Sequence, residues 1–287
     1  MFDGFKREFI YVGDAVLRVR HGGSGPAVLL LHGHLRTHAT WHRVAPLLAA
    51  HHTVACPDLG GFGQSSKPGN TPDHSGSSKR AKAADCIALM QRLGFERFAI
   101  VGHDRGSYTA FRTAMDHPAA ITHLAVLDGV PIEALERCDV RFASAGGTWF
   151  FFAHVEKPER AILADPELWY PGTPEQMGME AYADFLVATR DPETIHGMLE
   201  DYRAGLGIDR DHDEADRRAA RKVQCPTLAL WSLRDDLEQL YGDVLSVWRP
   251  WTTRLEGRGL DFGHHVAEEV PDEVAVELLR FLTSAET

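Results

Sequence analysis

Five short runs of apolar, mostly branched residues recur along the chain, and they limit its fold more than any other feature. The runs are Ala27–Leu31, Thr53–Cys56, Phe98–Val101, Leu124–Leu127 and Thr227–Trp231. Consecutive apolar positions are typical of strands that are buried on both faces of a parallel sheet. Stretches with helical periodicity lie between several of these runs. We therefore predict an α/β fold, in which helices cover both faces of a mostly parallel sheet.

The alternation of strands and helices breaks in residues 131–223. That stretch contains the aromatic run Trp149–Phe152 and polar helical segments, but no obvious buried strand. Because predicted strands lie on both sides of it, we predict a single core made of residues 1–130 and 224–287. Residues 131–223 are predicted to form a helical cap over the carboxyl edge of the sheet. The acidic stretch Asp209–Asp216 is expected to be a solvated surface of this cap.

Composition excludes several classes of protein. With 30 lysine and arginine residues against 41 aspartate and glutamate residues, the net charge is 30 − 41 = −11, which disfavours nucleic acid as a partner. No apolar run approaches the ~18 residues that a membrane span needs, and the start of the chain lacks a signal-peptide pattern. The four cysteines are widely spaced and the histidines have no metal-ligand spacing, so we expect no metal site. A cytoplasmic protein is expected.

The segment Gly102–Gly106 carries the sharpest functional signal, since it follows one predicted strand and precedes a helix expected to begin near Ser107. Its pattern, Gly-His-Asp-Arg-Gly, is that of a nucleophile elbow with Asp104 where many hydrolases have serine. A carboxylate can displace a leaving group from sp³ carbon or open an epoxide, which forms an ester that water then cleaves. On this motif alone, a second interpretation stays open: Asp104 caps the following helix.

Three further segments bear on that choice. His32-Gly33 follows the first predicted strand, where such folds place backbone N–H donors for a developing negative charge. Asp58–Ser65 forms a glycine-rich turn after the next strand, and His264-His265 lies in a loop before the last predicted helix. A histidine there is typical of a general base in the chain order nucleophile, acid, histidine. Each segment alone is more often structural, but the four in this order favour catalysis.

With these motifs the chain resembles the α/β-hydrolases over essentially its whole length. The elbow GHDRG, the segment DLGGFGQSSKP and the late GHH resemble the haloacetate (fluoroacetate) dehalogenases within that superfamily. The resemblance implies that Asp104 displaces halide from a 2-haloacid and that Arg105 binds the substrate carboxylate. A planar guanidinium suits a bidentate contact of that kind. His264 is preferred to His265 as the base because it follows the glycine, as the catalytic histidine does in the family.

The acid that orients His264 has two candidate positions. Asp128, after the predicted strand Leu124–Leu127, matches the position of the third triad member in the dehalogenases. Asp235 and Asp236, after the last of the five apolar runs, lie where the acid is commoner among α/β-hydrolases. We favour Asp128 because the family match is specific, and the other two stay open.

The chain also departs from the family pattern. Tyr108 stands where the family commonly has a second arginine, and Thr148 stands where it has a halide-binding histidine, whereas Trp149 and Tyr202 match the rest of the halide pocket. The loss of one strong donor predicts better turnover of chloro- and bromoacetate than of fluoroacetate. His34, just after the His-Gly turn, is expected either at the mouth of the pocket or on the surface.

These observations predict a hydrolase with an aspartate nucleophile that displaces halide from a short 2-haloacid through a covalent ester. One alternative is an epoxide hydrolase with the same machinery, in which Tyr202 or another cap tyrosine is the acid. Another is a ligand-binding relative without catalysis. The expected partner is a small molecule with a carboxylate, and no cofactor is expected. The oligomeric state stays open, with a homodimer as one option.

Overall fold

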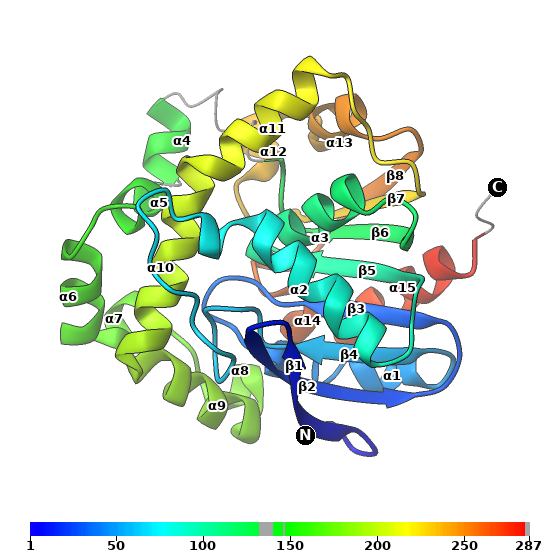
Figure 1. Cartoon of the computed structure of the whole chain (residues 1–287), viewed down its shortest axis with the longest axis horizontal. Helices are drawn as coiled ribbons and strands as arrows, with labels where there is room; N and C mark the ends of the chain where they lie inside the picture. Colours follow the sequence, from blue (N-terminus) through cyan, green and yellow to red (C-terminus); the bar gives the residue numbers. More distant parts are fainter. Residues whose placement is uncertain (132–139, 146, 285–287) are drawn as a thin grey trace.

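The computed structural model of the protein describes residues 1–131, 140–145 and 147–284. In it, one eight-stranded sheet has the strand order β1-β2-β4-β3-β5-β6-β7-β8 (Figure 1). The strands are β1 (Lys6–Val12), β2 (Ala15–Gly23), β3 (Ala27–Leu31), β4 (Thr53–Pro57), β5 (Phe98–His103), β6 (Ile121–Leu127), β7 (Thr227–Ser232) and β8 (Leu255–Leu260). Strands β3 to β8 all run parallel to one another, whereas β2 is antiparallel to both of its neighbours, β1 and β4. The predicted α/β architecture is confirmed.

The five predicted strands are β3 to β7, and the prediction missed β1, β2 and β8. The missed strands lie at or next to the two edges of the sheet. In β1 most side chains are exposed, and in β8 exposed and half-buried residues alternate. A strand that water reaches does not need an apolar run, so these segments lack the pattern from which the central strands were predicted.

Helices bury both faces of the sheet. On one face, Leu29 and Leu31 pack in one apolar cluster with side chains of α2 (Lys79–Arg92) and α3 (Arg105–Asp116), which cross in front of the sheet in Figure 1. On the other, Val28 and Leu30 pack with α1 (Ala45–Ala49) and α15 (Pro271–Leu282). The remaining core helices are η1 (His38–Trp41), η2 (Ser75–Ser77), α12 (Leu237–Tyr241), α13 (Val244–Trp248), η4 (Arg249–Trp251) and α14 (Val266–Glu269).

In the described part of the stretch between β6 and β7, the regular elements are all helices, and most of them gather at one side of the sheet (Figure 1). They are α4 (Val140–Ala145), α5 (Gly147–Phe152), α6 (Lys157–Ala164), α7 (Pro166–Trp169), α8 (Pro174–Met177), α9 (Met179–Arg190), α10 (Pro192–Leu206) and α11 (Ile208–Arg218). We call α4 to α11 the cap. Nowhere in the described residues does a helix combine the length and apolarity that crossing a bilayer requires.

One face of the acidic stretch of α11 is not the solvated surface that was expected, although Asp211 on the other face is exposed. Asp209, Asp213 and Asp216 are buried, and their spacing of four and three residues puts them on one face of the helix. Arg112 of α3 binds Asp213 and Asp216, and Lys79 of α2 binds Asp209. The prediction failed for this face because the cationic partners lie far away in the sequence, 101 residues for Arg112 and Asp213 and 130 residues for Lys79 and Asp209. The acidic face of α11 therefore joins the cap to the core.

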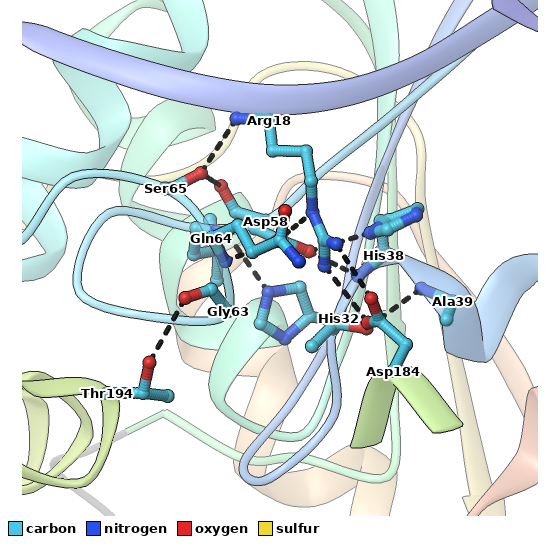
Figure 2. A network of polar contacts seen from close by, with 12 residues as sticks. Arg18, His32, His38, Ala39, Asp58, Gly63, Gln64, Ser65, Asp184 and Thr194 are labelled. Carbon is cyan, nitrogen blue, oxygen red and sulfur yellow. Dashed lines mark hydrogen bonds and ion pairs between the residues drawn. The ribbon is translucent and has the colours of Figure 1, made fainter. Parts of the chain in front are cut away.

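A second polar network joins the cap to the core around Asp58, at the start of the glycine-rich turn (Figure 2). Arg18 of β2 donates to Asp58 through Nε at 2.6 Å and to Asp184 of α9 through Nη1 at 2.6 Å. Burial alone would raise the pKa of Asp58, but His38 and Arg18 hold it well below its usual range. A Cβ on Gly63, where φ is +48°, would collide with the Asp58 carboxylate. The turn that begins at Asp58 therefore has a structural role, since it helps to hold the cap against the core.

Candidate active site

Asp104 lies in the sharp turn between β5 and α3. Its φ and ψ are +48° and −119°, a conformation that costs energy for any residue other than glycine and that clusters at functional sites. A Cβ on Gly102 would collide with the carbonyl group of Gly106, and one on Gly106 would collide with the end of β3. The helix begins at Arg105 rather than near Ser107, and the Asp104 side chain makes no capping hydrogen bond to it. The capping interpretation of Asp104 is therefore wrong.

The Asp104 carboxylate is held from two sides. Its Oδ1 accepts a hydrogen bond of 2.6 Å from the backbone N–H of His34, and its Oδ2 lies 3.8 Å from Nε2 of His264. Burial raises the pKa of Asp104, but the nearby histidines His264 and His103 and the hydrogen bond from His34 outweigh burial and lower it. Asp104 is therefore ionised at neutral pH, as a nucleophilic carboxylate must be.

Two acids meet the other side of the His264 ring. Its Nδ1 lies 2.8 Å from Oδ2 of Asp128 and 3.0 Å from Oδ2 of Asp235. Burial would lower the pKa of His264, but the hydrogen bonds to both acids and the charge of Asp104 raise it well above its ordinary value. His265 lies beside this ring, with a centroid separation of 5.2 Å. Of the three acids that the sequence left open, Asp128 and Asp235 thus reach the ring. Asp236 does not bond to the ring but lines a cavity beside it, which is described below.

The strand register explains why residues so far apart in sequence meet here. In the parallel sheet, Leu31 pairs with Gly102, His103 with Leu127, and Leu127 with Leu230. The carboxyl ends of β3, β5, β6 and β7 therefore lie at one edge, where the residues that follow each strand come together. Ligand sites in open α/β sheets occupy this edge.

Two cavities meet at Asp104, and Trp149 and His264 line both of them. The larger, of about 310 Å³, we call the aromatic cavity; its remaining lining residues are His34, Leu35, Arg36, Thr148, Phe152, Trp169, Tyr170, Pro171, Tyr202 and His265. The smaller, of about 110 Å³, we call the acidic cavity; its remaining lining residues are Tyr108, Asp128, Gly129, Val130, Phe142, Asp235, Asp236, Leu237, Leu240 and Tyr241. Every predicted site residue except Arg105 lines one of the two.

His34 lies in the wall of the aromatic cavity, which decides between the two placements that the sequence left open. Its ring meets Tyr202 edge-on at 4.9 Å, and Phe152 and Tyr170 lie at 5.3 and 5.6 Å. Neither ring nitrogen has a hydrogen-bond partner among the described residues. Burial lowers the pKa of His34 to about 3, so the ring is neutral. It offers one donor and one acceptor to whatever occupies the cavity.

Arg105 is bound by an internal carboxylate. Its Nε donates to Asp201 Oδ2 at 2.6 Å and its Nη2 donates to the Asp201 carbonyl oxygen at 2.8 Å. The guanidinium lies 4.1 Å from the ring centre of Tyr202 and 4.8 Å from that of Trp149. Its Nη1 is buried and has no partner among the described residues. Asp201 was not predicted as a site residue, although it directly precedes Tyr202 in the segment Glu-Asp-Tyr-Arg.

His103, Asp128 and His264 are the three described residues whose ligand atoms cluster as a metal site would require, within 4.8 Å of one another. Hydrogen bonds already use this cluster: His103 Nε2 bonds to the His264 carbonyl oxygen at 2.7 Å, and His264 Nδ1 bonds to Asp128. A ring nitrogen that donates a hydrogen bond has no lone pair for a metal ion. The arrangement therefore favours a hydrogen-bonded triad over a metal centre.

Comparisons with known proteins agree in pointing to α/β-hydrolases. The family model described as "alpha/beta hydrolase fold" matches residues 26–162. A fluoroacetate dehalogenase of Burkholderia sp. is 42% identical, over 99% of this chain and 96% of that protein. A soluble epoxide hydrolase of Corynebacterium sp. (strain C12) is 31% identical, over 90% of this chain and 91% of that protein. A solved structure from Nostoc sp. PCC 7120, assigned to the α/β hydrolases, has a TM-score of 0.95 and 37% identity, covering 99% and 100% of the two chains.

Proposed function

Because this chain belongs to the α/β-hydrolase family, we propose that it hydrolyses the carbon–halogen bond of a short 2-haloacid, with Asp104 as nucleophile, His264 as base and Asp128 as orienting acid. The observation that carries the proposal is the Asp104 carboxylate, ionised and held between the His34 N–H and the His264 ring where two cavities meet. The 42% identity to a fluoroacetate dehalogenase supports the substrate class.

In the first step, Asp104 attacks the carbon that bears the halogen. Since Oδ1 accepts the hydrogen bond from His34, Oδ2 is the oxygen that forms the new C–O bond. The halide leaves with the electron pair of the C–X bond, and an ester of Asp104 remains. This step needs no base because the carboxylate is already ionised.

In the second step, His264 activates water. Nε2 takes a proton from a water molecule as that water attacks the carbonyl carbon of the ester, and the charge that develops on Oδ1 is stabilised by the His34 N–H. The tetrahedral intermediate then expels the product oxygen, which receives the proton from His264. Asp104 returns to its carboxylate form with release of one proton, so the sum is RX + H₂O → ROH + H⁺ + X⁻.

The proposed substrate contacts divide between the two cavities. Arg105 lines neither cavity, but the rings of Tyr108 and Tyr202, at 5.3 and 4.1 Å from its guanidinium, line one each. Its positive charge and its buried donor without a partner, Nη1, therefore favour a substrate carboxylate beside these rings, where the neutral hydroxyl of Tyr108 adds a hydrogen-bond donor. His34, Thr148, Trp149 and Tyr202 surround the leaving group and the body of the substrate in the aromatic cavity. From these contacts we propose a small carboxylate as the partner. Residues of the chain supply the nucleophile, the base and the hydrogen-bond donors in both steps, so the proposed reaction uses no cofactor.

A second candidate function, epoxide hydrolysis, is favoured by one observation. The cap tyrosines Tyr170 and Tyr202 both line the aromatic cavity together with Asp104. Burial raises the pKa of both hydroxyls, so they stay protonated and could donate to the oxygen of an opening epoxide. The 31% identity to a soluble epoxide hydrolase supports this candidate.

A halide-release screen tests the proposal. Wild type and Asp104→Asn are incubated with fluoro-, chloro- and bromoacetate, with the matching haloacetamides and with a panel of epoxides. We expect halide release from the acids, little from the amides and none from the variant. Epoxide opening without halide release would support the second candidate, whereas saturable binding of the acids without turnover of any compound would contradict both and indicate a ligand-binding protein.

A further inference from the structure

His264 has one more acid than a triad needs. Nδ1 of the ring carries a single hydrogen when it donates, yet carboxylate oxygens of Asp128 and Asp235 lie 2.8 and 3.0 Å from that atom. The two acids follow neighbouring parallel strands, β6 and β7. Both are therefore within hydrogen-bond distance of the same proton.

The two acids approach the ring from different surroundings. The Asp128 side chain is 2% exposed, and its Oδ1 accepts a hydrogen bond of 3.0 Å from the Ser232 N–H. The Asp235 side chain is 35% exposed, and its Oδ1 accepts a hydrogen bond of 2.9 Å from the Asp236 N–H. Each carboxyl group thus has one oxygen fixed by the backbone and the other turned to His264.

Other ionisable groups also face this ring. They are Asp104 at 3.8 Å from Nε2, the rings of His103 and His265, and more distantly His34, Arg36 and Asp236. Burial raises the pKa of Asp128 despite its bond to His264, whereas the bonds to His264 and Asp128 lower the pKa of Asp235.

We propose that Asp235 is a second positioning residue for His264, and that Asp128 and Asp235 together hold the Nδ1–H. Either carboxyl group orients the ring when the other is removed. The role of the oriented ring as a base rests on the proposed function, but the pair itself is a property of the resting protein. The pair stabilises the imidazolium form, and its loss moves the titration of His264 to lower pH.

The first experiment titrates His264 without any substrate. The ring nitrogens of ¹⁵N-histidine-labelled protein are followed by NMR in wild type, Asp128→Asn, Asp235→Asn and the double variant, with His264→Gln to assign the signal. We expect the His264 pKa to fall by about one pH unit or more in each single variant and further in the double. Asp236→Asn is the matched control, since it removes a neighbouring carboxylate that does not bond to the ring, and its effect should be less than half that of Asp235→Asn.

The second experiment measures the hydrolytic step in the same variants with chloroacetate. Each single variant should keep kcat within about tenfold of wild type, with the acidic limb of its pH profile moved to lower pH. The double variant should lose about 10²- to 10⁴-fold, as expected for a general base that is no longer oriented. All should still release the first equivalent of chloride, because Asp104 is untouched.

An unchanged His264 titration in Asp235→Asn would overturn the inference, as would a loss in Asp128→Asn equal to that in the double variant. Because the titration needs no turnover, it decides the matter even if chloroacetate and the other haloacids are not substrates. In that case the proposed function fails separately.

Discussion

The two cavities that meet at Asp104 differ in what lines them. Besides Asp104, which lines both, the acidic cavity presents three carboxyl groups, Asp128, Asp235 and Asp236, while the aromatic cavity is lined mainly by aromatic side chains, His34 among them, together with the guanidinium of Arg36. In the proposed reaction, the acids that orient His264 for the second step thus lie on one side of Asp104, and most of the residues proposed to surround the substrate lie on the other. Changes on the acidic side should therefore alter turnover of every substrate, whereas changes on the aromatic side should alter the ratio between substrates.

Substitution of Asp104, where the two cavities meet, should reduce turnover more than any other change. We expect Asp104→Asn to reduce turnover of all substrates by about 10⁴-fold or more, because the neutral amide cannot attack carbon and no ester forms. Rapid-quench measurement of halide should show no burst. Asp261→Asn, which changes an exposed carboxylate paired with Arg234, is the control and should retain both activity and burst. A burst of one equivalent in a freshly purified Asp104→Asn protein would show that the nucleophile lies elsewhere.

On the acidic side, His264→Gln should separate the two steps. Steady-state turnover should fall by about 10²- to 10⁴-fold, the usual contribution of a general base, while one equivalent of halide is still released. Mass spectrometry should find the added mass of the trapped ester on the intact protein and, after digestion, on the peptide that contains Asp104. His265→Gln is the matched control, since that ring bonds to neither Asp128 nor Asp235. A His264→Gln protein that releases no halide at all would contradict the assignment of this histidine to the second step alone.

On the aromatic side, Thr148 should set the preference among halides. One missing donor to a departing ion costs on the order of 2–4 kcal/mol of transition-state stabilisation, so wild type should release chloride and bromide faster than fluoride. Thr148→His should raise the fluoride rate selectively, and Thr148→Val should leave the ranking of the halides unchanged. Halide-specific assays on matched haloacetates measure the ratio. Equal rates of fluoride and chloride release by wild type would remove the basis for this prediction.

The smallest effect is expected at His34. Its neutral ring can contribute one hydrogen bond, worth about 0.5–1.5 kcal/mol, so His34→Phe should change kcat/KM by about threefold to tenfold, with different factors for different substrates. The backbone N–H that holds Asp104 remains in this variant, so kcat for the best substrate should change little. A uniform loss across all substrates would mean that the ring supports the machinery rather than selecting the substrate.

The parts of the structure that the sequence could predict are those set by local requirements. The strands β3 to β7 are predictable because burial on both faces demands apolar runs, and Asp104 because a sharp strand–helix turn demands glycines at fixed positions. His264 and Asp128 were preferred because their positions, after a glycine and after a strand, match the family pattern. These are local requirements, which a single segment of sequence can express.

The missed contacts join segments that are distant in the sequence. Nothing near Arg105 indicates that Asp201 would bind its guanidinium, and nothing near Asp213 and Asp216 indicates the partner Arg112. The simultaneous approach of Asp128 and Asp235 to His264 depends on the register of β6 against β7. Such contacts require the three-dimensional arrangement of the strands and the cap.

The central claim is that Asp104 becomes esterified, and an isotope experiment tests it most directly. Wild-type protein in excess over chloroacetate is allowed a single turnover in water enriched in oxygen-18, and both product and protein are analysed by mass spectrometry. Because water attacks the carbonyl carbon of the enzyme's own ester, the label should appear in the peptide containing Asp104 and not in the glycolate released. Label in the first-turnover glycolate, with an unlabelled Asp104, would mean that Asp104 acts as a base toward water and would contradict the covalent mechanism.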